Sequence, residues 1–120
     1  MPLISRILLA LAIILGFAGP AASQEIGEGF SLTATDGRRI GPDDLRGKPY
    51  VLFFGFTQCP DICPMTLTHL AQAQRQWEAL PEAIRPRVLF VSVDPERDTP
   101  ERLGDYAHAF HRDTLAATAD

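Results

Sequence analysis

Two short apolar runs separated by an amphipathic segment constrain the fold of this chain more than any other feature. The first run, YVLFFGF, covers residues 50–56, and the second, VLFVSV, covers residues 88–93. Both are too short for a typical helix and rich in branched or aromatic residues, so we predict two strands, the first buried on both faces. Between them, residues 64–80 have helical spacing of apolar positions. These positions are Leu67, Leu70, Ala71, Trp77 and Leu80. The pattern predicts a β-α-β unit with parallel strands, and therefore an α/β fold.

Weaker patterns flank this unit on both sides. Residues 30–40, with a turn at Asp36-Gly37, predict a β-hairpin at one edge of the sheet, and residues 42–47 predict a short helical turn. After the unit, Thr99 is expected to cap a helix that begins at Pro100 and ends near residue 111. The apolar face of that helix consists of Leu103, Tyr106, Ala107 and Phe110. Residues 114–120 show little periodicity, and we expect no regular element there.

The first 23 residues are typical of an export signal. Arg6 precedes an apolar stretch, residues 7–18, and Ala21-Ala22-Ser23 supplies the small residues that a signal peptidase requires. We predict a signal peptide over residues 1–23 and one domain over residues 24–120, located in the periplasm or at the outer face of the inner membrane. A retained membrane anchor is the alternative, although the apolar stretch is shorter than the ~20 residues of a spanning helix.

Charge and composition narrow the classes of function. The net charge is -4, and no run of lysine or arginine could follow a phosphate backbone, which excludes nucleic acid as the expected partner. Hydrophobic residues make up 46% of the chain, as in an ordinary globular domain with a core.

Cys59 and Cys63 carry the chemistry predicted for this chain. They lie where the first strand leads into the helix, and unpaired backbone N–H groups at a helix start stabilise a thiolate. A thiolate is both a nucleophile and a ligand for soft metal ions, so position alone does not choose between redox and metal chemistry. Three residues separate the cysteines, whereas thioredoxin-type oxidoreductases use two. The pair is too close to staple a long loop, and we interpret it as functional.

Two motifs resemble those of the Sco/SenC copper chaperones: FTQCPDICP at residues 56–64 and VDPERDTP at residues 93–100. The resemblance runs from about Phe30 to Phe110. It implies a thioredoxin-like fold that binds one copper ion and serves assembly of the binuclear copper centre of cytochrome c oxidase. Cys59 and Cys63 match the family's two thiolate ligands. The partners implied are the copper-binding subunit of the oxidase, copper carrier proteins and a thiol reductant, and the role is that of a metallochaperone rather than an enzyme.

The family's third copper ligand has no match in this chain. That histidine belongs to a later hairpin, beyond Asp120, together with the closing strands and the last helix, so we expect a truncated form or a fragment that binds copper more weakly than a complete domain. His69 lies ~120° around the helix from the cysteine side. His108 and His111 are explained by an exposed helix face.

Several alternatives stay open. A thiol-disulfide oxidoreductase or redoxin would use Cys59 to attack and Cys63 to resolve. Asp94 and Asp98 are explained equally well by partner docking or copper transfer and by turn formation and helix capping. Asp61 either caps the helix or tunes the thiols. Trp77 and the phenylalanines of the first strand are expected in the core.

Overall fold

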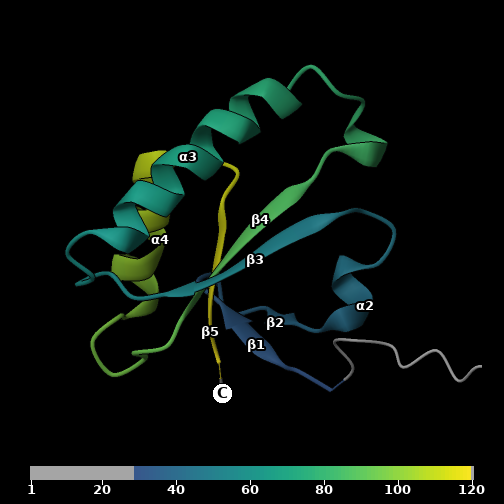
Figure 1. Cartoon of the computed structure of the whole chain (residues 1–120). Coiled ribbons are helices and arrows are strands. Elements are labelled where there is room, and N and C mark those ends of the chain that lie inside the picture. The colour runs from purple at the N-terminus through teal and green to yellow at the C-terminus, as the bar shows by residue number, and fades with distance from the viewer. Residues whose placement is uncertain (1–28, 120) are drawn as a thin grey trace, which may run out of the picture.

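A computed structural model describes residues 29–119, which form an α/β domain (Figure 1). The predicted signal peptide, residues 1–23, lies outside the described residues. The strands are β1 (Leu32–Ala34), β2 (Arg39–Ile40), β3 (Tyr50–Gly55), β4 (Arg87–Ser92) and β5 (Leu115–Ala119). The helices are α2 (Pro42–Leu45), α3 (Ile62–Trp77), the short 3-10 helix η1 (Glu82–Ile84) and α4 (Pro100–Phe110). No helix within residues 29–119 is long and apolar enough to cross a bilayer.

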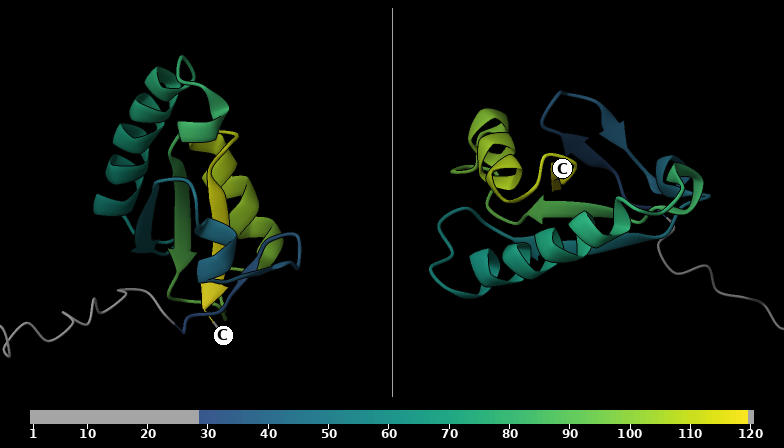
Figure 2. Two further views of the ribbon diagram at one scale, coloured as in Figure 1. Left: turned by 90° about the vertical axis from the view of Figure 1, so that its right-hand side faces the viewer. Right: turned by 90° about the horizontal axis from the view of Figure 1, so that it is seen from above.

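The five strands form one mixed sheet in the order β2-β1-β5-β4-β3. The pairs β3/β4 and β4/β5 are parallel, which confirms the predicted β-α-β unit. The predicted hairpin is also confirmed, because β1 and β2 pair antiparallel and β2 lies at one edge. At the other edge lies β3, and Figure 2 shows the long helix α3 running beside it and β4.

Alternate residues of β4 pack on opposite faces of the sheet. Phe90 joins Leu67 of α3 and Leu103 of α4 on one face, so both helices contribute to the same core cluster. Leu89 and Val91 point to the other face, where they pack with residues from the hairpin and α2. All of β4 except its first residue is buried, as expected for a central parallel strand covered on both sides.

The prediction that the first strand is buried on both faces is wrong. Along β3 the exposure alternates, and Phe54 is 59% exposed while Phe53 stacks on Phe90 with ring centroids 5.5 Å apart. The exposed positions Tyr50 and Leu52 share the face of Phe54, and β3 is an edge strand that no described element covers on that side. Uninterrupted hydrophobicity therefore indicated a strand correctly but its burial incorrectly.

The expectation of no regular element after residue 114 is also wrong. Residues Leu115–Ala119 form β5, which lies between β1 and β4 in the middle of the sheet (Figure 1). Apart from Leu115, its sequence, LAATA, consists of small side chains. Large apolar and polar residues therefore do not alternate along it, and periodicity gave no signal for a strand. Alanines fit here because β5 is paired on both sides and Ala116 and Ala117 pack into the two opposite core clusters.

The two long helices follow their predicted positions with shifted ends. Helix α3 begins two residues before the predicted start and ends at Trp77, which leaves Leu80 outside the helix and exposed. Helix α4 agrees with the prediction, because the Thr99 side chain accepts a hydrogen bond from the Arg102 N–H and the helix ends at Phe110. The short helical turn predicted over residues 42–47 is present as α2.

Candidate metal centre

The two cysteines lie at the junction of β3 and α3, at the carboxyl end of the parallel strands. The chain leaves β3 at Gly55 and turns at once, since the Cys59 N–H donates to the Phe56 carbonyl at 3.2 Å. Helix α3 begins at Ile62, so Cys63 occupies its first turn. Cys59 is partly exposed, whereas Cys63 is only 4% exposed, and neither sulfur forms a disulfide. The predicted pair is therefore brought together, with one accessible and one buried thiol.

The two thiols differ in their pKa. A hydrogen bond from the Cys63 thiol, together with backbone N–H groups of Cys63, Asp61 and Ile62, lowers the pKa of Cys59 below that of an ordinary cysteine. Burial raises the pKa of Cys63, and the neighbouring Cys59 sulfur raises it further. The start of α3 thus stabilises a thiolate at Cys59 and a protonated thiol at Cys63.

Gly55 provides the space in which Cys63 is buried. A Cβ atom added to Gly55 would lie 2.8 Å from Cε2 of Phe90, 3.0 Å from the Cys63 sulfur and 3.3 Å from Cε1 of Phe53. A larger residue would therefore force Phe90 to shift and the Cys63 sulfur and Phe53 to give way. A glycine inside an apolar strand often marks a close approach by another group, and this signal could have identified Gly55 from the sequence.

A buried carboxylate lies behind the loop that carries Cys59. Asp98 is 1% exposed and accepts hydrogen bonds from the Thr57 hydroxyl at 2.5 Å, the Ser92 hydroxyl at 2.6 Å and the Thr57 N–H at 3.0 Å. Burial alone would raise the pKa of Asp98, but the bonds from Ser92 and Thr57 outweigh it and hold the pKa below the usual value. Asp94, by contrast, forms an exposed ion pair with Arg97 at 3.3 Å.

Asp61 and Tyr106 complete the surroundings of the thiols. Asp61 occupies the N-cap position of α3, but its side chain makes no capping hydrogen bond, so its contribution to Cys59 comes from its backbone N–H. The Tyr106 hydroxyl is buried without a hydrogen-bond partner among the described residues. Burial raises the pKa of Tyr106, and the charges of Cys63, Cys59 and Asp98 add to this effect.

The histidines lie away from the two sulfurs. His69 and His108 are exposed, whereas His111 is only 8% exposed, so the expected surface position of His111 is wrong. His111 is the C-cap residue that follows α4, and its Nε2 lies 3.4 Å from the carboxylate of Glu78. Within residues 29–119, no histidine or carboxylate joins the cysteines in a group of three ligand atoms within 4.8 Å.

Glu78, His111 and Asp113 do gather their ligand atoms within 4.8 Å, but the hydrogen bond of His111 differs from that of a typical ligating histidine. Its Nδ1 accepts a hydrogen bond from the Asp113 N–H at 3.2 Å. In neutral imidazole the proton must then be on Nε2, the nitrogen that faces Glu78. A ligating histidine normally has the opposite arrangement, with its second nitrogen donating.

The chemistry of the donor set therefore selects the cysteine pair as the candidate metal centre. Two sulfurs, one in the loop before α3 and one in its first turn, suit a soft ion, and Cu(I) prefers thiolate ligands. The partly exposed Cys59 gives an incoming ion a path to the buried Cys63. The same two thiols could instead exchange disulfides, so their geometry permits both chemistries.

Known proteins resemble this chain over most of its length. The SCO1/SenC family model matches residues 18–120. A mitochondrial SCO2 homolog of Bos taurus is 46% identical over 94 residues, which is 78% of this chain and 35% of the relative. A mitochondrial SCO1 homolog 1 of Arabidopsis thaliana is 43% identical over 102 residues, covering 83% of this chain and 30% of the relative. The chain thus spans about a third of the length of these two relatives.

Solved structures give the same result. ScoI of Arabidopsis thaliana, solved with copper bound, superposes with a TM-score of 0.70 at 41% identity, over 79% of this chain and 58% of that one. ScoI of Bradyrhizobium japonicum, also with copper bound, superposes with a TM-score of 0.71 at 37% identity, over 79% and 59%. The expected thioredoxin-like fold is confirmed by these superpositions. With a matching family model, relatives above 40% identity and a shared fold, the chain belongs to the SCO1/SenC family.

Proposed function

We propose that this protein is a copper metallochaperone in which Cys59 and Cys63 hold the ion as thiolates and pass it on for assembly of the binuclear copper centre of cytochrome c oxidase. The observation that carries the proposal is the placement of two sulfurs in and just before the first turn of α3, with Cys59 accessible and Cys63 buried. Family membership supports the choice of ion, since solved relatives of two organisms contain copper.

Binding follows from the ionisation of the two thiols. Cys59, whose pKa is lowered, is the first sulfur available to an incoming Cu(I) ion. Cys63 must release its proton when it becomes the second ligand, and the positive ion offsets the burial that otherwise keeps this thiol protonated. Loading should therefore release protons and strengthen as the pH rises.

Delivery requires that the ion leave again by ligand exchange. Cys59 lies at the exposed side of the centre, so a cysteine or histidine of a recipient could approach the ion from that side while Cys63 still holds it. We propose that the recipients are the copper-binding subunit of the oxidase and copper carrier proteins. One solved relative is a member of the Sco family of cytochrome c oxidase assembly proteins, in agreement with this role.

The proposed location is the periplasm or the outer face of the inner membrane, reached through a signal over residues 1–23. In that compartment the cysteine pair would be exposed to oxidation, so copper loading also needs a thiol reductant of the Cys59–Cys63 disulfide.

A second candidate function, thiol-disulfide exchange, is favoured by the difference between the two pKa values. A lowered pKa at the accessible Cys59 and a raised pKa at the buried Cys63 are the properties of an attacking and a resolving thiol. A disulfide switch has been identified in one solved Sco relative. The two functions use the same sulfur atoms. A chaperone retains a copper ion on them, whereas an oxidoreductase forms and breaks a disulfide between them.

A parallel pair of assays separates the candidates. Reduced protein is titrated with Cu(I) against a competing chelator, and the same preparation is assayed for turnover of a disulfide substrate with a thiol reductant. We expect one Cu(I) retained per chain and slow turnover. Catalytic turnover without stoichiometric copper retention would exclude the chaperone role.

A further inference from the structure

Asp98 connects two loops that leave neighbouring parallel strands. It precedes Thr99, the N-cap of α4, and receives one hydrogen bond from Ser92, the last residue of β4. Its other two hydrogen bonds come from Thr57, two residues after the end of β3. The carboxylate thereby ties the loop after β3 to the end of β4 and the start of α4.

The loop held in this way carries Cys59 and follows the residue over which the Cys63 sulfur lies. Thr57 is the second residue of the turn closed by the bond from the Cys59 N–H to the Phe56 carbonyl. The Cys63 sulfur lies over Gly55, immediately before this turn. Because β3 is an edge strand, no described strand holds the loop from its outer side. Among the described contacts, the Thr57 bonds to Asp98 span 41 residues of sequence and anchor the loop to the rest of the domain.

The three donors explain why an ionised side chain is buried at this position. Burying an unpaired carboxylate is costly, and burial becomes tolerable only when its oxygens are hydrogen-bonded. Oδ1 of Asp98 accepts from the Thr57 hydroxyl, and Oδ2 accepts from the Thr57 N–H and the Ser92 hydroxyl. An asparagine with its NH2 group toward Thr57 would have to donate to the Thr57 hydroxyl, which reverses that hydrogen bond, and its neutral oxygen would accept the other two bonds more weakly than a carboxylate does.

We propose that Asp98 is a positioning residue for the thiol pair, which fixes the separation of Cys59 and Cys63 through its two hydrogen bonds to Thr57. The inference deepens the proposed copper-binding function and rests on it for its biological meaning. Asp98 is not itself a ligand, because both of its oxygens are engaged by protein donors. Its effect is to preorganise the two sulfurs, so that neither copper binding nor disulfide closure has to order the loop first.

The variants that test this proposal are Asp98→Asn, Thr57→Val and the double variant, with two matched controls. Thr57→Ser keeps both donors to Asp98. Glu96→Gln removes an exposed negative charge from the loop between β4 and α4 that contains Asp98, and leaves Thr57 unchanged. Each folded protein is measured in two ways: Cu(I) affinity by chelator competition, and the dithiol–disulfide equilibrium constant against glutathione. Thermal unfolding of each variant is recorded to separate stability from positioning.

We expect Asp98→Asn and Thr57→Val each to weaken Cu(I) binding by roughly 10- to 100-fold, the usual effect of losing an outer-shell partner. Both should also disfavour the Cys59–Cys63 disulfide by about tenfold, because the effective concentration of one thiol at the other falls when the loop loosens. Thr57→Val removes the hydroxyl bond and keeps the backbone N–H bond, so its effect should lie toward the lower end of this range. The double variant should lose little more than Asp98→Asn alone, because Asp98→Asn already weakens the contact that Thr57→Val removes. Thr57→Ser and Glu96→Gln should stay within twofold of the wild type.

Two results would overturn the proposal. One is an unchanged disulfide equilibrium in both Asp98→Asn and Thr57→Val, whatever their thermal stability. The other is an equal change in Glu96→Gln, which would indicate a general effect of charge. If the wild type retains no Cu(I) while the disulfide equilibrium still shifts in these variants, the positioning role stands and the copper function fails. If Asp98→Asn does not fold, Thr57→Val decides alone.

Discussion

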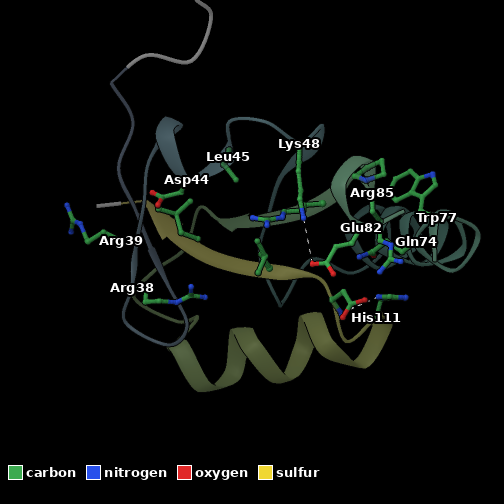
Figure 3. A pocket seen from close by; sticks show the side chains of 15 residues that line it. Arg38, Arg39, Asp44, Leu45, Lys48, Gln74, Trp77, Glu82, Arg85 and His111 are labelled. Carbon is green, nitrogen blue, oxygen red and sulfur yellow. Dashed lines mark hydrogen bonds and ion pairs between the residues drawn. The ribbon is translucent and has the colours of Figure 1, made fainter. Parts of the chain in front are cut away.

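The two ends of the parallel strands differ in how their polar groups are used. At the amino end lies a groove of about 720 Å³ lined by many charged side chains, including Lys48, Arg85 and Glu82 (Figure 3). At the carboxyl end a few groups gather closely around Cys59 and Cys63. The groove lies at the amino end, whereas the thiols and Asp98, whose pKa values are shifted, lie at the carboxyl end.

The charges of the groove largely serve the fold. Lys48 reaches across to Glu82 at 3.7 Å, as Figure 3 shows, and Arg85 donates to the carbonyls of Glu78 and Leu80 beyond the end of α3. At the carboxyl end, by contrast, the arrangement gives two chemically identical thiols different pKa values, lowered at Cys59 and raised at Cys63. The comparison shows that convergence of reactive groups identifies the site better than the volume of a groove does.

The largest expected effect comes from removing either sulfur. Cys59→Ser and Cys63→Ser should each lower Cu(I) affinity by more than about 100-fold, because a hydroxyl is a poor ligand for a soft ion. Chelator competition measures the loss. An equal loss on Glu78→Gln, at the amino end, would show that the two ends are not functionally distinct.

Gly55→Ala should have the next largest effect. The added methyl group would lie too close to Phe90 and the Cys63 sulfur, and overpacking of this kind costs about 1 to 3 kcal/mol of unfolding free energy. Urea denaturation measures this cost. Gly37→Ala is the control for losing a glycine, since its positive φ is strained but nothing lies within 4 Å of an added Cβ. If only Gly55→Ala also weakens copper binding, the packing against Cys63 is confirmed.

The pH dependence of Cys59 sharpens the contrast between the two thiols. The largest cause of its lowered pKa is the hydrogen bond from Cys63. Cys63→Ala removes this donor and should raise the pKa of Cys59. Cys63→Ser keeps a donor, so the pKa of Cys59 should be lower in Cys63→Ser than in Cys63→Ala. Alkylation rates across pH measure both. Because the pKa is lowered by folding, the thiolate stabilises the fold above the pKa of an ordinary cysteine, and this contribution disappears as the pH falls through the lowered value. Equal titration of the two variants would contradict the assignment.

Glu78→Gln at the amino end should have the smallest effect. Its carboxylate is half exposed and makes one contact with His111 at 3.4 Å, so the loss should be below about 1 kcal/mol of unfolding free energy. Cu(I) affinity should be unchanged. Thermal unfolding and the same chelator competition measure the two quantities.

The sequence predicted the parts of the molecule that depend on local patterns. The β-α-β unit, the hairpin and the Thr99 cap follow from periodicity, turn residues and capping preferences, and all three are present. Cys59 and Cys63 were located by the same reasoning, because a strand-to-helix junction is a local feature.

What could not be predicted depends on contacts between distant segments. Strand β5 is built from small residues whose role is set by β1 and β4 on either side, and the exposure of Phe54 is set by the position of β3 at the sheet edge. Asp98 was compatible with capping or with docking, and only the approach of Thr57, 41 residues away, shows what its carboxylate contacts. His111 was predicted to lie on an exposed face because its contact with Glu78 joins the end of α4 to the end of α3, and the local sequence pattern does not show such a contact.

X-ray absorption at the copper edge of the Cu(I)-loaded protein reports directly which atoms hold the ion. We expect two sulfur neighbours from Cys59 and Cys63, and loss of one sulfur in either serine variant. A first shell of nitrogen and oxygen alone, unchanged in both serine variants, would place the ion away from the thiols and contradict the account.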